Sequence, residues 1–229
     1  MLNTYYKDRL IPNHQIAYDD LCVGIRNLNR EIKVRYTDDL YNVVMAVNYD
    51  HPEFFYVNWL DRISYSTLFT HLVVRVNYIY TEKEIMDIND RMKSISRCIA
   101  GISNYGKALG IHDWFVKNIK YDHEGLGQVM YSPGMFSAAG PLITQKGVCE
   151  GISKLACYLM REKGIDSNIV TGTSYDGTPH AWNMLEVDGK ILHTDITYDI
   201  GISTRNTIQR KYFLLSQNEI VRDRTINYF

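Results

Sequence analysis

A cysteine between two glycines, at the start of a helical pattern, is the residue best placed to do chemistry. The segment KGVCEGISKLACYLMREKGI covers residues 146–165, with Cys149 between Gly147 and Gly151. Apolar residues recur at helical spacing after it, so Cys149 falls in the first turn of a predicted helix. The free N–H groups and the dipole at a helix N-terminus favour a thiolate over a thiol. The glycines remove side chains and would let a substrate approach closely.

A buried structural cysteine is the alternative interpretation, because free cysteine is often packed in the core. Cys157 fits that description, since it lies in the middle of the same predicted helix. Disulfides are not indicated, because the cysteines are sparse and irregularly spaced; they are Cys22, Cys98, Cys149 and Cys157. Zinc-ligand spacing is also missing, and we expect no metal and no cofactor.

A β-hairpin further along the chain brings a histidine and an aspartate together. Two alternating runs, TPHAWNMLEV and KILHTDITYD, flank Asp188-Gly189, which predicts a two-residue turn. In that register Asp195 faces Trp182, and His180 is its diagonal neighbour at about 7–8 Å along the backbone. The imidazole and the carboxylate therefore share one face of the sheet.

Beside a thiol, such a pair forms the nucleophile–base–orienter arrangement of covalent catalysis. The carboxylate accepts one ring N–H of His180 and leaves the other nitrogen to face Cys149. The helix of Cys149 needs a sheet to pack on, and this hairpin is the best candidate. We expect His193, nearer the hairpin turn, and His112, on a helix, to be structural.

Composition excludes some classes of partner. The chain has 229 residues, with 25 basic against 26 acidic residues, which favours neither nucleic acid nor an anionic membrane. A hydrophobic fraction of 45% suits a globular protein with a sizeable core. The sequence shows neither a transmembrane run nor the apolar region of a signal peptide. We therefore expect a cytoplasmic protein, or an exported one whose leader has been removed; the oligomeric state stays unknown.

The elements expected to position these residues run from helices to strands. Helical spacing covers residues 15–49, and alternating strand patterns cover 62–80. Thr81 opens a capping-box helix through about residue 100, and a further helix is predicted over 104–119.

A loop-like stretch, 121–146, precedes the helix of Cys149, for which Gly164 is the expected end. Ser216 is expected to cap a last short helix. Strands are predicted over 168–174, 180–187, 190–198 and 211–215. This order indicates an α+β fold, with an N-terminal extension over 1–100 and a catalytic core over 101–229.

Three motifs resemble the transglutaminase-like superfamily of papain-like cysteine enzymes: GVCEGISKLACYLMREKGI, PHAWNMLEVDGKI and HTDITYD. The resemblance runs over residues 111–220, about half of the chain. It implies a papain-like transglutaminase core with Cys149 as nucleophile, His180 as general base and acid, and Asp195 as orienting carboxylate. Thr197-Tyr198 stands where such proteins often have Thr-Trp, which keeps an aromatic residue. The N-terminal hundred residues look like the extensions of bacterial members.

The resemblance also implies attack by sulfur on a carbonyl, loss of an amine, and a thioester that water or another amine resolves. The superfamily includes cross-linking enzymes, proteases, peptide N-glycanases and inactive members, so fold and triad do not fix the reaction. We predict action on an amide of a protein or peptide. Hydrolysis is favoured over cross-linking, because the sequence identifies no second amine site. The alternative is an inactive module that binds protein or peptide.

Stabilisation of an oxyanion requires hydrogen-bond donors. The backbone N–H of Cys149 is expected to be one of them. The candidates for the second donor are Gln145, Tyr131 and Tyr121. Trp182, opposite Asp195, is expected to shield the His–Asp hydrogen bond from water.

Overall fold

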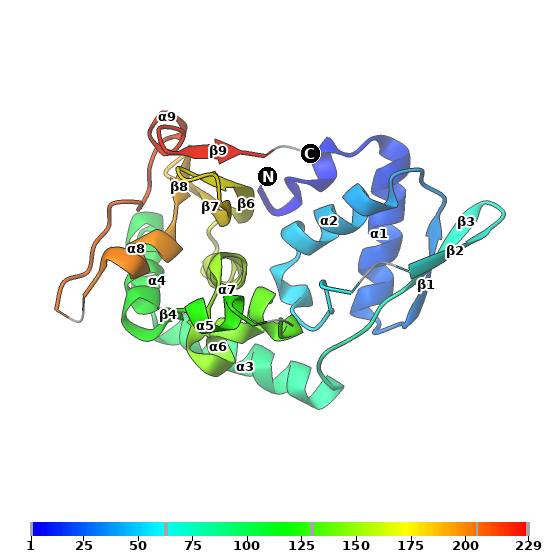
Figure 1. Ribbon diagram of the computed structural model, residues 1–229, viewed down its shortest axis with the longest axis horizontal. Helices are drawn as coiled ribbons and strands as arrows, with labels where there is room; N and C mark the ends of the chain where they lie inside the picture. Colours follow the sequence, from blue (N-terminus) through cyan, green and yellow to red (C-terminus); the bar gives the residue numbers. More distant parts are fainter. Residues whose placement is uncertain (1, 62–63, 129–130, 205, 228–229) are drawn as a thin grey trace.

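The computed structural model describes residues 2–61, 64–128, 131–204 and 206–227. A four-stranded antiparallel sheet, in the order β8-β7-β6-β9, lies in the C-terminal half of the chain. A second, three-stranded sheet, in the order β1-β3-β2, lies in the N-terminal region at the opposite end of the molecule (Figure 1). The helix of Cys149 lies between these two regions, and the predicted α+β fold is confirmed.

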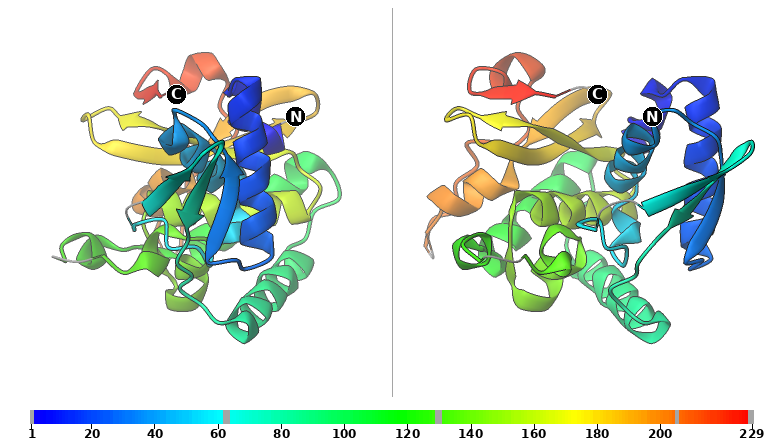
Figure 2. Two further views of the ribbon diagram at one scale, coloured as in Figure 1. Left: turned by 90° about the vertical axis from the view of Figure 1, so that its right-hand side faces the viewer. Right: turned by 45° about the vertical axis from the view of Figure 1, so that its right-hand side comes forward.

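The N-terminal region begins with the short 3₁₀ turns η1 (Leu2–Thr4) and η2 (Lys7–Arg9). Its longer elements are α1 (Pro12–Arg26), β1 (Glu31–Arg35), α2 (Leu40–Asp50), η3 (Pro52–Phe54), β2 (Ser64–Leu68) and β3 (His71–Arg75). The β2–β3 hairpin projects away from the rest of the chain (Figure 2). Of the strand range predicted over 62–80, residues 62–63 lie outside the described part of the chain.

The continuous helical pattern predicted over 15–49 is wrong, because β1 interrupts it. Leu28 takes a positive φ of 55° and ends the turn after α1. Ile32 and Val34 are buried on alternate positions of β1. Gly24 of α1 makes room for this strand, since a Cβ there would lie 2.5 Å from a side-chain carbon of Ile32.

The middle of the chain, between the N-terminal region and the helix of Cys149, consists of helices and short strands. The capping box at Thr81 opens α3 (Glu82–Cys98) as predicted, and α4 (Asn104–Asn118) follows. The stretch predicted as a loop over 121–146 holds short elements instead, apart from 129–130, which lie outside the described residues. These elements are β4 (Lys120–Tyr121), α5 (His123–Leu126), η4 (Pro133–Phe136), α6 (Ala139–Thr144) and β5 (Lys146–Gly147).

The helix α7 (Cys149–Glu162) packs on the strands β6 (Ser167–Ser174) and β7 (Pro179–Val187). Ser153 Oγ donates to the carbonyl of Ala181, and Asn183 Nδ2 donates to the carbonyl of Ser153. The helix therefore covers the face of β7 opposite to the one that Trp182 and Met184 occupy in a second apolar cluster. Gly164, with a φ of +76°, follows the end of α7 as predicted.

The predicted hairpin register is confirmed. Val187 pairs with Lys190, and Asp188 and Gly189 form the turn with φ values of 52° and 74°. The second strand, β8 (Lys190–Thr194), is shorter than predicted because Asp195 caps the helix α8 (Ile196–Ile202).

The end of the chain differs more from the prediction. Residues 211–215 form no strand, although Leu215 makes an isolated bridge to His193. Ser216 caps α9 (Gln217–Ile220) as predicted. The strand β9 (Arg224–Ile226), which pairs with β6, was not predicted, because three residues show no periodicity.

One buried apolar cluster runs through both regions of the chain and includes Ile25, Val47, Leu155 and Ile169. Asp50, at the end of α2, is fully buried and accepts from the N–H of Tyr6 and from Asn168 Nδ2. The N-terminal region therefore packs into the same core as α7. A domain boundary near residue 100 stays a prediction.

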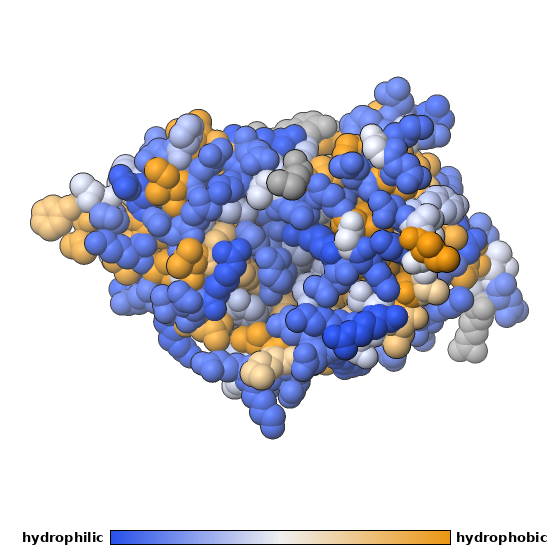
Figure 3. Space-filling view, turned by 180° about the vertical axis from the view of Figure 1, so that it is seen from behind, coloured by the Kyte–Doolittle hydropathy of each residue, from blue (hydrophilic) through white to orange (hydrophobic). Residues whose placement is uncertain are grey.

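The surface carries both hydrophobic and hydrophilic residues (Figure 3). On the rear face, hydrophobic residues form small patches among hydrophilic ones (Figure 3). Among the described residues, no helix combines the length and the apolar character needed to cross a membrane.

Candidate active site

Cys149 is the first residue of α7 and is partly exposed. Val148 occupies the N-cap position without a side-chain cap, and the N–H of Cys149 has no acceptor within its own helix. A Cβ on Gly151 would lie 2.5 Å from the carbonyl oxygen of Met135, and one on Gly147 would lie 2.6 Å from Pro141 Cγ. The space beside both glycines is therefore filled by the protein itself, not left open for a substrate as we expected.

His180 lies between a thiol and a carboxylate. Its Nε2 is 2.8 Å from Asp195 Oδ2, which leaves Nδ1 as the nitrogen available to Cys149. Burial alone would lower the pKa of His180, but hydrogen bonds with Asp195 and Cys149, together with their charges, raise it to about 9. The imidazolium form is therefore favoured at neutral pH.

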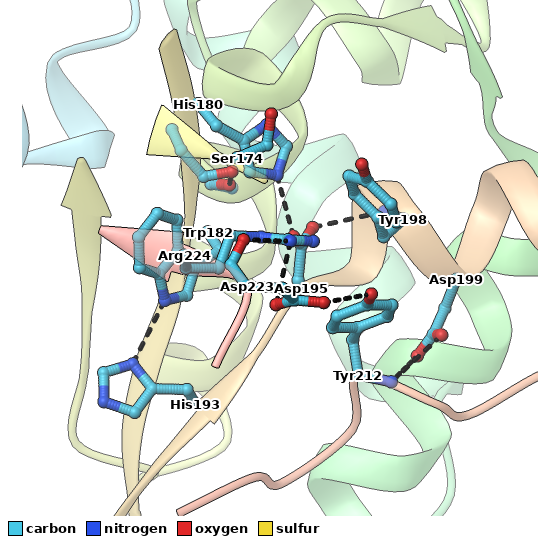
Figure 4. A network of polar contacts seen from close by, with 12 residues as sticks. Ser174, His180, Trp182, His193, Asp195, Tyr198, Asp199, Tyr212, Asp223 and Arg224 are labelled. Atoms are coloured by element: carbon cyan, nitrogen blue, oxygen red, sulfur yellow. Dashed lines mark hydrogen bonds and ion pairs between the residues drawn. The ribbon is translucent and has the colours of Figure 1, made fainter. Parts of the chain in front are cut away.

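Asp195 is fully buried, and its carboxylate accepts hydrogen bonds from three residues. Its Oδ1 accepts the N–H of Tyr198 at 3.2 Å and so caps α8. Its Oδ2 accepts from His180 and also from the guanidinium of Arg224, at 3.0 Å from Nη2 and 3.3 Å from Nε (Figure 4). Sequence reasoning missed Arg224, because nothing near it in the sequence marks a buried cation.

Trp182 lies beside the imidazole on the same strand. Its ring is nearly parallel to that of His180, with 6.0 Å between centroids, and it has no exposed surface. Its Nε1 donates to His193 Nδ1 at 3.1 Å, and His193 Nε2 donates to Gln217 Oε1 at 2.7 Å. Burial lowers the pKa of His193. Both nitrogens of His193 are thus engaged by Trp182 and Gln217.

His112 is also held by neighbouring groups. Its Nδ1 lies 3.1 Å from Asp113 Oδ1 and its Nε2 lies 3.0 Å from Asp199 Oδ2, and the ring is fully buried. This pair joins α4 to α8, which fits the structural role expected for His112.

Three residues were expected as candidates for a second oxyanion donor, and Tyr121 interacts electrostatically with Cys149 and Asp195. Burial and the charges of Cys149 and Asp195 raise the pKa of Tyr121 to about 12, so its phenol is neutral at physiological pH. Tyr131 is 47% exposed and its ring contacts that of Phe136. Gln145 is exposed, with a positive φ of 56° at the end of α6.

The other thiols differ from Cys149 in environment. Burial raises the pKa of Cys157 to about 11 and that of Cys22 to about 12. Cys157 Sγ donates to the carbonyl of Ser167, whereas Cys98 is exposed. Within the described ranges, no three His, Cys, Asp or Glu side chains are grouped so as to hold a metal ion.

Comparison with known proteins finds one family whose model matches part of the chain. The model of the transglutaminase-like superfamily core matches residues 95–196, which carry all of α7 and the His180–Asp195 pair. No curated protein matches the chain.

Several solved structures show a limited likeness. One is a "TGase", with 16% identity over 79% of this chain and a TM-score of 0.47. Another is a "putative cysteine protease" from Cytophaga hutchinsonii, with 16% identity over 59% of this chain and a TM-score of 0.38. A third is a "putative protease" from Parabacteroides distasonis, with 14% identity over 56% of this chain and a TM-score of 0.36.

The chain spans 53%, 61% and 29% of these three structures, respectively. None of the TM-scores reaches 0.5. The family resemblance of this chain therefore rests on residues 95–196, which match the core of the transglutaminase-like superfamily.

Proposed function

We propose that the protein is a cysteine-dependent enzyme that cleaves or transfers at an amide of a protein or peptide. The observation that carries this proposal is the placement of His180. Asp195 Oδ2 lies 2.8 Å from Nε2 of His180, and the imidazole also forms a hydrogen bond with the thiol of Cys149 at the start of α7. In the proposed roles, Cys149 is the nucleophile, His180 the general acid and base, and Asp195 the group that orients the imidazole.

The first half of the reaction forms a thioester. The thiolate of Cys149 attacks the carbonyl carbon, and the carbonyl electron pair moves onto oxygen. When the oxyanion collapses, the carbon–nitrogen bond breaks, and the imidazolium of His180 gives its proton to the departing amine. The raised pKa of His180 supports this step, because the acid form is then available at neutral pH.

The second half regenerates the thiolate. Neutral His180 takes a proton from water, and the hydroxide attacks the thioester and displaces the sulfur as a carboxylic acid forms. An amine in place of water would give a new amide instead. We favour hydrolysis, since the sequence identified no second amine site.

Oxyanion stabilisation is proposed to come from the N–H of Cys149 and a side-chain donor. Tyr121 is the best-supported side chain, because its neutral phenol can donate and its ionisation responds to the charge of Cys149. Gln145 remains a candidate on sequence alone. Trp182 is proposed to cover one side of the His180 ring and limit the access of water.

The N-terminal region is proposed to form one wall of the substrate cleft. Burial raises the pKa of Tyr49 on α2, and the charges of Glu150 and Cys149 contribute to this rise, so Tyr49 lies near the thiol. A cavity of about 590 Å³ borders α2 and β3, and Asn48 is among its lining residues. None of the three proposed catalytic residues lines that cavity, so we assign it no catalytic role.

The test is turnover on a peptide library together with trapping of the acyl-enzyme at Cys149. We expect Cys149→Ala to abolish turnover and trapping while the fold is kept, because the first turn of a helix tolerates alanine. Iodoacetamide should modify Cys149 faster than the exposed Cys98, which serves as an internal reference. Peptide binding without turnover, with Cys149 no more reactive than Cys98, would instead identify a binding module.

A further inference from the structure

We propose that Arg224 is a positioning residue of this site. It fixes the carboxylate of Asp195 beside His180, and its charge favours the thiolate of Cys149. The inference rests on the proposed function, and it adds a fourth residue that neither the family match nor the sequence motifs include. Arg224 lies outside residues 95–196, the segment that matches the family.

Direct contacts join Arg224 to the carboxylate that holds His180. Its Nη2 and Nε lie 3.0 Å and 3.3 Å from Asp195 Oδ2, the same oxygen that accepts from His180. The other oxygen, Oδ1, accepts the N–H of Tyr198. Both oxygens of Asp195 therefore have donors, so the carboxylate cannot rotate without losing a hydrogen bond.

The guanidinium itself is held on several sides. Its carbon Cζ lies 4.1 Å from the ring centroid of Tyr198 and 4.7 Å from that of Tyr212. Its Nη1 donates to the carbonyl and to Oδ1 of Asp223, whose Oδ2 accepts from the hydroxyl of Tyr212 (Figure 4). The side chain of Arg224 is fully buried, and a planar group stacked in this way loses little further entropy on pairing.

The strand β9 brings Arg224 to the site from the end of the chain. Arg224 pairs with Ser174, and Ile226 pairs with Gly172 of β6. A Cβ on Gly172 would lie 1.8 Å from the carbonyl oxygen of Thr225, so only glycine lets β9 approach so closely. Arg224 is therefore brought to the site by a segment that follows the part of the chain matched by the family model.

The charges of the group explain why an arginine is useful there. Protonated His180 and ionised Asp195 together have no net charge, so the carboxylate offsets part of the attraction between the imidazolium and a thiolate. Arg224 offsets the charge of Asp195, so these three residues together carry a net charge of +1, which favours the thiolate of Cys149. Other ionisable groups around these residues are Tyr49, Tyr121, Glu150, Tyr198, Tyr212 and Asp223, with Asp176 acting on Tyr198 and Lys154 paired with Glu150. Asp223 pairs with Nη1 and offsets part of the charge of Arg224, but its side chain is 33% exposed, so solvent weakens its effect on the thiolate.

This arrangement predicts opposite effects for the two partners. Arg224→Met removes a positive charge, so the thiolate becomes less stable and the imidazolium more stable. The pH profile for Cys149 alkylation should have a lower inflection, where the thiolate forms, and an upper one, where His180 loses its proton. Both inflections should then move to higher pH, by about one unit or more. Asp195→Asn removes a negative charge, so both inflections should move to lower pH. A merely structural arginine would lower the stability of the protein without this opposed pair of shifts.

The experiment is alkylation of the full chain by iodoacetamide from about pH 4 to about pH 10, with Cys149 and Cys98 quantified separately by mass spectrometry. Arg222→Met is the matched control, since Arg222 is exposed and lies in the same segment. We expect its profile to match that of the wild type. Arg224→Lys keeps the charge but loses the two-nitrogen contact, so its inflections should stay in place while kcat falls about tenfold or more with little change in KM.

Circular dichroism shows which variants are folded. If Arg224→Met is unfolded, the kcat of Arg224→Lys decides whether the proposal holds. The proposal is overturned if folded Arg224→Met has the wild-type pH profile, or if Arg224→Lys has the wild-type kcat. Failure of the proposed function looks different: wild-type Cys149 would react no faster than Cys98, and no acyl-enzyme would form.

Discussion

The hydrogen bond between Asn48 and Lys154 offers a direct test of how the N-terminal region supports the helix of Cys149. Lys154 lies in the second turn of α7 and is 2% exposed. Its Nζ donates to Asn48 Oδ1 at 2.7 Å, to the carbonyl of Phe136 at 3.0 Å and to Glu150 Oε1 at 2.6 Å. One ammonium therefore ties α2, η4 and the residue after Cys149 together.

The size of the effect follows from burial. Removing one partner of a buried ion pair costs about 3–5 kcal/mol, and the lower end applies because the side chain of Glu150 is 24% exposed. Lys154→Met keeps much of the volume, so we expect a loss of about 3 kcal/mol in the free energy of unfolding. In a chain of this size that corresponds to a fall in Tm of about 6–12 °C.

A double-mutant cycle isolates the contact between the two regions. Asn48→Leu, Lys154→Met and the double variant are unfolded in urea, and a coupling of about 1–2 kcal/mol is expected for a hydrogen bond to a charged group. Gln209→Leu, which is exposed and shares no partner with Lys154, should combine additively with Lys154→Met. Zero coupling, or a wild-type Tm for Lys154→Met, would refute this account of how α2 is held against α7.

Three further predictions concern the thiols, the glycine beside the proposed nucleophile and pH. Cys157→Ala should keep the reactivity of Cys149 and lose about 1 kcal/mol of stability through a small cavity, measured by urea unfolding; a dead Cys157→Ala would mean that the wrong thiol was chosen. Gly151→Ala should lower stability by about 1–3 kcal/mol and slow alkylation, because its Cβ would meet the carbonyl of Met135; an unchanged Tm would contradict this. The pKa of His180 is raised to about 9, so its protonation stabilises the fold fully below about pH 6.5 and this contribution is lost as pH rises through about 9. Wild-type stability should therefore fall over that range, and fall less in His180→Gln.

The hairpin that carries His180 could be predicted because a two-residue turn fixes register. Asp188-Gly189 determines that Val187 pairs with Lys190, and every later position follows by counting. The end of β8 was misjudged, since Asp195 leaves the strand to cap α8. Aspartate is a preferred N-cap residue, so the sequence did contain a local signal for that helix start.

Other features had no local signal. Ile32 fits a helical pattern as well as a strand, and only its packing against Gly24 distinguishes the two. Arg224 is the clearest case, because its burial depends on Tyr198 and Tyr212, which are distant in sequence. The ion pair between Arg224 and Asp195 depends on tertiary contacts. The strand that carries Arg224 has three residues, which is too short for a periodic pattern to predict it.

The several tasks of Asp195 determine how its variants should be interpreted. Its Oδ2 holds His180 and Arg224, while its Oδ1 caps α8 through the N–H of Tyr198. Asp195→Asn can keep an oxygen at the cap but loses the negative charge, so turnover should fall by orders of magnitude with a smaller loss of stability. Asp195→Ala loses the cap as well, which costs about 0.5–2 kcal/mol more. Measured side by side, turnover should be low in both variants, and Tm should be lower in Asp195→Ala; equal Tm values would show that the cap contributes nothing, and wild-type turnover in Asp195→Asn would remove Asp195 from the proposed triad.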